Sequence, residues 1–173
     1  VLADPVALAS DLGQPRAAAI SNRLHDGARL GRAFTRLRAN EHGEPSVFAH
    51  GDLHLSNLYL TREGRAGLLD WTPLRVPWAF DVAYFLGGCL DPIDRRRWEQ
   101  PLLQHYLSKL ENLGIEAPSF DAAWDAYRRW MLWGLYVWLF NIPAYHSEEN
   151  ITAMTARYGT AMVDLDTLGR IGC

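Results

Sequence analysis

Apolar residues in the N-terminal part of the chain recur with a helical period. Residues 5–12 predict a short helix that ends at Gly13. Residues 15–39 predict one long helix, because apolar side chains recur near every 3.6 residues while arginines occupy the other face. Its apolar positions are Ala17, Ile20, Leu24, Ala28, Leu30, Phe34 and Leu37. Residues 40–45 predict a loop.

Three short runs in the middle of the chain have the character of β-strands. They cover residues 46–49, 57–61 and 66–69. The turn sequence TREG at residues 61–64 predicts that the last two form a hairpin. Residues 71–78, which contain two prolines, predict an irregular loop.

The rest of the chain predicts four helices. They are expected over residues 79–90, about 92–113, about 120–141 and about 148–168. Asp91 before Pro92, then Ser119 or Asp121, and finally Ser147 are the expected N-terminal caps of the last three. The order predicts a mostly helical α+β fold in a single domain over residues 1–173, with a small β cluster in the middle.

Composition excludes some functions. The net charge of −3 argues against a nucleic-acid partner. The longest apolar run, residues 130–142, is shorter than the ~20 residues needed to cross a bilayer, so no membrane span is expected. The two cysteines, Cys89 and Cys173, make no disulfide framework, which favours a cytoplasmic protein. Three arginines at residues 95–97 predict a solvated helix face.

Polar, chemically competent groups gather where the chain otherwise builds apolar strands. The sequence HGDLHLSN places Asp52 in a loop and Asn57 at the entry to the next strand. Asp70 follows the partner strand of the predicted hairpin, so we expect it beside Asn57. A carboxylate and an amide oxygen suit Mg²⁺, while a second carboxylate can accept a proton from a hydroxyl. This division of roles is typical of phosphoryl transfer.

Three stretches together resemble a known family. HGDLHLSN, then LLDW, then PWAFDVAYFL at residues 77–86 are similar to motifs of the aminoglycoside phosphotransferase and choline kinase superfamily, which contains protein-kinase-like enzymes that phosphorylate small molecules. The last stretch most resembles the branch of ecdysteroid-kinase-like and bacterial phosphotransferases. The resemblance implies a protein-kinase-like C-terminal lobe that transfers the γ-phosphate of ATP, with Mg²⁺, to a small-molecule alcohol.

The resemblance also implies a role for each matching residue. Asp52 would be the catalytic base, and His50 a structural member of the catalytic loop. Asn57 and Asp70 would hold Mg²⁺ on ATP. Asp81 would support the loop by accepting backbone N–H bonds at a helix start.

The part of a kinase that covers the nucleotide has no counterpart before His50. Residues 1–49 contain no lysine and no G-x-G-x-x-G sequence, although a kinase N-lobe would supply both. We therefore expect a C-lobe without its N-lobe, with weak or no kinase activity alone. The surface that normally meets the N-lobe predicts self-association.

Two other functions stay open from the residues. One is a non-catalytic kinase-fold fragment or binding module, favoured by the missing ATP lysine. The other is a metallohydrolase that uses His50, Asp52 and His54, although such a site needs further ligands. His54 has no role that the sequence assigns.

A dense aromatic series follows in the predicted helix at about 120–141. Its side chains are expected mainly in the core. A second interpretation places Tyr127, Trp130 or Trp133 in a pocket for the acceptor alcohol. The sequence does not identify that acceptor.

Overall fold

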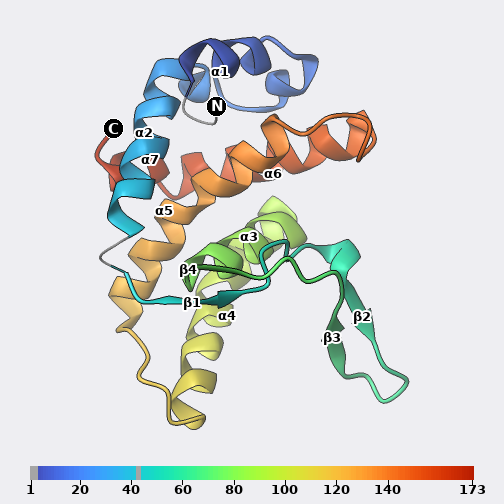
Figure 1. Ribbon diagram of the computed structural model, residues 1–173, viewed down its shortest axis with the longest axis vertical. Helices are drawn as coiled ribbons and strands as arrows, with labels where there is room; N and C mark the ends of the chain where they lie inside the picture. The colour runs from blue at the N-terminus through green and yellow to red at the C-terminus, as the bar shows by residue number, and fades with distance from the viewer. Residues whose placement is uncertain (1–3, 42–43) are drawn as a thin grey trace.

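The computed structural model describes residues 4–41 and 44–173 (Figure 1). Its helices are α1 (Pro5–Leu12), α2 (Gly27–Asn40), α3 (Ala79–Cys89), α4 (Pro92–Asn112), α5 (Phe120–Leu139), α6 (Glu148–Asp164) and α7 (Thr167–Ile171), with short 3₁₀ helices η1 (Pro15–Ala19), η2 (Asn22–Leu24) and η4 (Leu55–Asn57). Its strands are β1 (Ser46–Ala49), β2 (Leu58–Leu60), β3 (Ala66–Leu68) and β4 (Leu74–Pro77). The predicted mostly helical α+β class is confirmed.

The strands form two separate antiparallel pairs. The predicted hairpin is confirmed as β2–β3, in which Leu58 lies opposite Leu68. Strand β1 pairs with β4, so the prediction of an irregular loop over residues 71–78 is wrong in its second half. Proline is tolerated in β4 because each strand of a two-stranded sheet has a free edge. The hairpin projects away from the helices that carry the core (Figure 1).

The long helix predicted over residues 15–39 is divided into η1, η2 and α2. The Ser21 side chain accepts a hydrogen bond from the Arg23 N–H, and that of Asp26 accepts one from the Arg29 N–H. Each therefore opens a new helical segment, as short polar side chains do at helix starts. Within the loop predicted at 40–45, residues 42 and 43 lie outside the described part of the chain.

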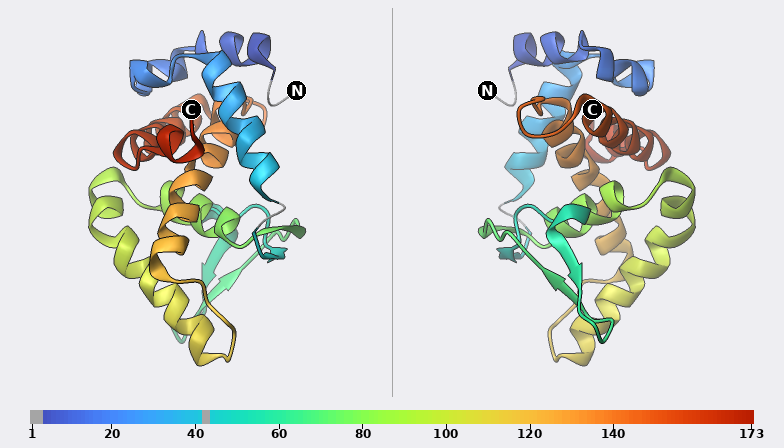
Figure 2. Two further views of the ribbon diagram at one scale, coloured as in Figure 1. Left: turned by 90° about the vertical axis from the view of Figure 1, so that its left-hand side faces the viewer. Right: turned by 90° about the vertical axis from the view of Figure 1, so that its right-hand side faces the viewer.

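The last predicted helix is also divided. Helix α6 ends at Asp164, and Asp166 has a φ of 51° before α7 begins. A residue in the left-handed region cannot continue an α-helix, so the chain turns here. The C-terminal segment then packs beside α2 and α5 (Figure 2).

Helix α5 is the centre of the hydrophobic core. It packs against both α3 and α6, and these two helices also contact each other. Gly134 allows close approach of α6, because a Cβ there would lie 2.0 Å from Cε1 of Tyr158. Within residues 4–41 and 44–173, no helix combines the length and apolar character that a membrane crossing needs.

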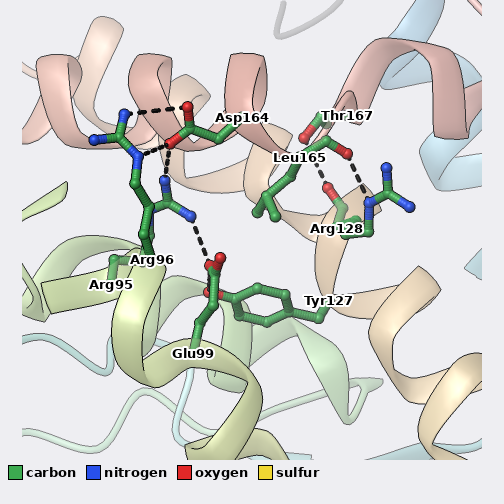
Figure 3. A network of polar contacts seen from close by, with 8 residues as sticks. All are labelled: Arg95, Arg96, Glu99, Tyr127, Arg128, Asp164, Leu165 and Thr167. Carbon is green, nitrogen blue, oxygen red and sulfur yellow. Dashed lines mark hydrogen bonds and ion pairs between the residues drawn. The ribbon is translucent and has the colours of Figure 1, made fainter. Parts of the chain in front are cut away.

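A polar network joins α4, α5 and α6 beside this core (Figure 3). Arg95 is 1% exposed, so the prediction of a solvated face is wrong at this position. Its guanidinium donates to Glu99 Oε2 at 2.6 Å and to Asp164. Tyr127 also donates its hydroxyl to Glu99 Oε2, at 3.0 Å. Arg96 continues the network to Asp164 at the surface.

Candidate active site

The polar loop after β1 is held by a carboxylate from the first turn of α3. Asp81 Oδ2 accepts a hydrogen bond from the His50 N–H at 2.5 Å, and its Oδ1 accepts one from the Gly51 N–H at 3.2 Å. Both donors belong to backbone that no strand or helix satisfies. Asp81 therefore fixes the start of the loop against α3.

The ring of His50 connects this loop to the end of β3. It is 2% exposed. Its Nδ1 accepts a hydrogen bond from the Asp52 N–H at 3.3 Å, which leaves Nε2 to donate to the Leu69 carbonyl at 2.8 Å. The two bonds assign one neutral tautomer to the ring. His50 thus supports the backbone on both sides of the site.

Glycine is required at position 51. Its φ is +89°, and a Cβ there would lie 2.1 Å from the Thr72 carbonyl oxygen. Thr72 in turn donates its backbone N–H to the His50 carbonyl at 3.0 Å. The loop therefore lies directly against the segment that follows Asp70.

The base of the hairpin brings the backbone of Asn57 opposite Leu69, the residue before Asp70. The Leu69 N–H donates to the Asn57 carbonyl at 2.8 Å, which extends the β2–β3 pairing by one position. Asn57 also donates its side-chain Nδ2 to the Asp52 carbonyl at 2.8 Å. The amide nitrogen is therefore engaged, and Oδ1 has no hydrogen-bond donor in the described part of the chain.

Asp70 has an unusual backbone conformation. Its φ is 53°, in the left-handed region that few residues other than glycine adopt. Such conformations persist where the surrounding structure imposes them, often at functional sites. Here the turn directs the chain from β3 to Thr72, back against the loop.

The oxygen atoms in this place fit Mg²⁺. The Asn57 Oδ1 and the Asp70 carboxylate are a small set of hard oxygen donors, such as Mg²⁺ takes when phosphates and water complete its ligands. Among the residues that the structure describes, no group of three or more His, Cys, Asp or Glu is placed to hold a metal ion. With only these two donors from the described residues, the other ligands of such an ion would have to come from phosphate and water.

Asp52 is half-buried beside His54. The His54 ring donates from Nε2 to Asp52 Oδ2 at 3.4 Å, and this hydrogen bond is the main cause that lowers the pKa of the Asp52 carboxyl. Burial opposes the shift without cancelling it. Asp52 is therefore a carboxylate at neutral pH. The sequence motif contained His54, but nothing in its spacing predicted this contact.

Comparison with known families bears on this arrangement. The family model described as the phosphotransferase enzyme family matches residues 3–133, which include the loop, the hairpin and most of α5. The chain belongs to the phosphotransferase enzyme family. Searches among curated proteins and among solved structures found no match.

Two aromatic residues considered for an acceptor pocket lie in the core of this phosphotransferase family member. Tyr127 is 0% exposed and Trp130 is 1% exposed. Trp133 is partly buried, and its ring packs against those of Phe34 and Phe80. The pocket interpretation is wrong for Tyr127 and Trp130, because side chains enclosed in this way present no surface to a ligand.

The Asp81 contacts give a test of the loop's stability. Asp81→Asn should lower the free energy of unfolding by about 1–3 kcal/mol, because the amide nitrogen cannot accept a hydrogen bond, whereas both oxygens of the carboxyl group keep acceptor lone pairs in either protonation state. Burial raises the pKa of the Asp81 carboxyl, so folding favours its protonated form. The contribution of this protonation to the free energy of unfolding is complete below the ordinary aspartate pKa of about 3.9. It is lost as pH rises through the raised pKa of the folded state.

The cost of Asp81→Asn should therefore shrink as pH rises through the acid range. Urea unfolding of both proteins at a series of pH values measures this. A cost that stays constant across the series would contradict the raised pKa, and no cost at any pH would contradict the supporting role.

Proposed function

We propose that this chain is the catalytic, C-terminal lobe of an ATP-dependent phosphotransferase that transfers a γ-phosphate to the hydroxyl of a small molecule. One observation carries the proposal. The Leu69-to-Asn57 hydrogen bond brings the residue before Asp70 opposite Asn57, while Asn57 itself binds the backbone of Asp52. This arrangement supports the proposal that a base and two metal ligands share one edge of the fold. The ecdysteroid-kinase-like branch and a cytoplasmic location belong to the same proposal.

In the proposed reaction Asp52 orients the acceptor hydroxyl and takes its proton. The hydroxyl oxygen forms a bond to the γ-phosphorus, and the bond from that phosphorus to the β,γ-bridging oxygen breaks to release ADP. The lowered pKa keeps Asp52 ionised and makes it a weak base. A weak base suffices because positioning and charge neutralisation supply most of the catalysis in phosphoryl transfer.

Asn57 and Asp70 would hold Mg²⁺ on the nucleotide. The ion, when bound, neutralises the charge of the β- and γ-phosphates. The Asn57 side chain can present Oδ1 because its nitrogen is fixed on the Asp52 carbonyl. The same bond couples the metal side of the site to the base.

The proposal assigns to this chain only the catalytic-loop and metal side of the nucleotide site. Residues 1–49 contain no lysine for the α- and β-phosphates. Apolar side chains just before the loop and just after Asp70 are open to solvent, with Phe48 83% and Trp71 56% exposed. Their exposure supports the further proposal that this face meets an N-lobe or another copy of the chain.

Magnesium-dependent ATP binding tests the proposed function. We expect the protein to bind ATP in the presence of Mg²⁺, and Asp70→Ala to abolish that dependence because it removes the charged metal ligand. Isothermal titration with and without Mg²⁺ measures both. Asp52→Asn is the matched control, since Asp52 acts on the acceptor and should leave nucleotide binding unchanged.

The outcomes separate the candidate functions. Equal Mg²⁺ dependence in the protein and in Asp70→Ala would contradict the assigned metal site. Absence of ATP binding altogether would favour the non-catalytic kinase-fold module. The metallohydrolase has less support, because both ring nitrogens of His50 are engaged in the loop.

A further inference from the structure

A cavity of about 260 Å³ lies behind the catalytic loop. His54 and Ser56, at the turn η4, line it together with Asn150, Met154 and Arg157 of α6. His146, before the start of α6, and Trp138, near the end of α5, complete the polar and aromatic lining. The cavity therefore joins the loop to a helix that the proposed chemistry does not use.

The cavity contains a positive charge that no carboxylate in the described part of the chain neutralises. Arg157 of α6 lines it, half-buried, and donates from Nη1 to the Gly88 carbonyl at 2.6 Å. Within the described residues it has no ion pair, whereas buried Arg16 and Arg95 each contact a carboxylate. A half-buried charge without a counter-ion is costly, and an anionic ligand would supply one.

The other lining residues favour the same kind of ligand. His146, Asn150 and Ser56 carry hydrogen-bond donors, and none of the described residues that line the cavity is Asp or Glu. A cationic ligand would find no opposite charge on these walls. A carboxylate or phosphate would find a guanidinium and several neutral donors.

His54 separates the cavity from the proposed base. Its Nε2 lies 3.4 Å from Asp52 Oδ2, and its ring centroid lies 6.2 Å from that of His146. The Trp138 ring contacts both, with its centroid 4.9 Å from that of His146 and 6.4 Å from that of His54. A molecule seated here therefore lies one side chain away from Asp52.

We propose that this cavity binds the anionic group of the acceptor, and that the acceptor is a small hydroxy acid. The inference rests on the proposed phosphotransferase function. Arg157 pairs with the acid group, and His146 and Asn150 hold it by hydrogen bonds. The hydroxyl end of the molecule extends along His54 toward Asp52.

Glycerate and glycerol are matched probes, because they differ by one carboxylate. Isothermal titration should show that the protein binds glycerate at least about tenfold more tightly than glycerol, as one charge-assisted hydrogen bond implies. Arg157→Gln should remove this preference and Arg157→Lys should retain part of it. Arg62→Gln, the same change on the exposed hairpin turn, should have no effect.

Equal affinity for the two probes, no binding of glycerate, or an unchanged preference in Arg157→Gln would each overturn the proposal. Titration of ATP and Mg²⁺ into the same variants separates this result from the function itself. Arg157→Gln should bind ATP as the unchanged protein does. Loss of nucleotide binding there would show a general structural defect and overturn the specific role of Arg157.

Discussion

Asp52→Asn should slow phosphoryl transfer by about 10²–10⁴-fold, the usual contribution of a positioned general base. The amide can still accept a hydrogen bond from the acceptor hydroxyl, but it cannot take the proton. Its carbonyl oxygen can also accept the hydrogen bond that the His54 ring donates to Asp52 Oδ2 in the unchanged protein. The loss should therefore reflect the chemistry of the side chain rather than its position.

The fold of the loop should survive this change. The bonds that shape the loop use the backbone of residue 52: its N–H donates to His50 Nδ1, and its carbonyl accepts from Asn57 Nδ2. Neither depends on a carboxylate. We therefore expect the unfolding transition and Mg²⁺-dependent ATP binding of the variant to match those of the unchanged protein.

Transfer from γ-labelled ATP to an alcohol identified in an acceptor screen measures the effect. Asp121→Asn is a suitable control, because it makes the same change at an exposed position in the first turn of α5. It should leave the rate unchanged. If Asp52→Asn transferred phosphate as fast as this control, Asp52 would not be the base.

Local patterns predicted most of the elements around the site. Strand β1, the β2–β3 hairpin and helices α3 to α5 each follow from a few neighbouring residues, such as the Asp91 cap before Pro92. The hairpin in turn predicts that Asn57 and Asp70 are neighbours, and the Leu69-to-Asn57 hydrogen bond brings the residue before Asp70 opposite Asn57. These features depend on short-range chemistry that the sequence displays directly.

Features that depend on distant partners were not predictable in this way. Strand β4 forms because β1, nearly thirty residues earlier, offers it a free edge, as in the pairing of Val47 with Val76. Arg95 is buried because α6 brings Asp164 to it. In both cases the local sequence gives the opposite indication, and tertiary contacts decide the outcome.

The residues that line the polar cavity beside the candidate site were also not predictable from local sequence. His54 and Arg157 are separated by about a hundred residues, and neither position has a spacing that marks it as a ligand. The dense aromatic series in α5 suggested a pocket for the acceptor alcohol, yet Trp130 lies in the core. Helical periodicity identifies which residues share a face, but not which face meets a ligand.

Arg95→Met should lower the free energy of unfolding by about 3–5 kcal/mol, as removal of one partner from a buried ion pair does. Among the described residues, the change leaves the Glu99 carboxylate, which is 5% exposed, with the Tyr127 hydroxyl as its one hydrogen-bond donor (Figure 3). Asp164 is less affected, because it keeps its contact with Arg96 near the surface. Urea unfolding followed by circular dichroism measures the loss.

Two further variants identify the cause. Arg97→Met, on the exposed side of the same helix, should cost less than about 1 kcal/mol, because it loses only a cation–π contact with Trp98. Adding Glu99→Gln to Arg95→Met should recover much of the stability, because it removes the uncompensated buried charge. If the double variant were as unstable as the sum of its parts, the loss would come from packing of the long arginine stem and not from the stranded carboxylate.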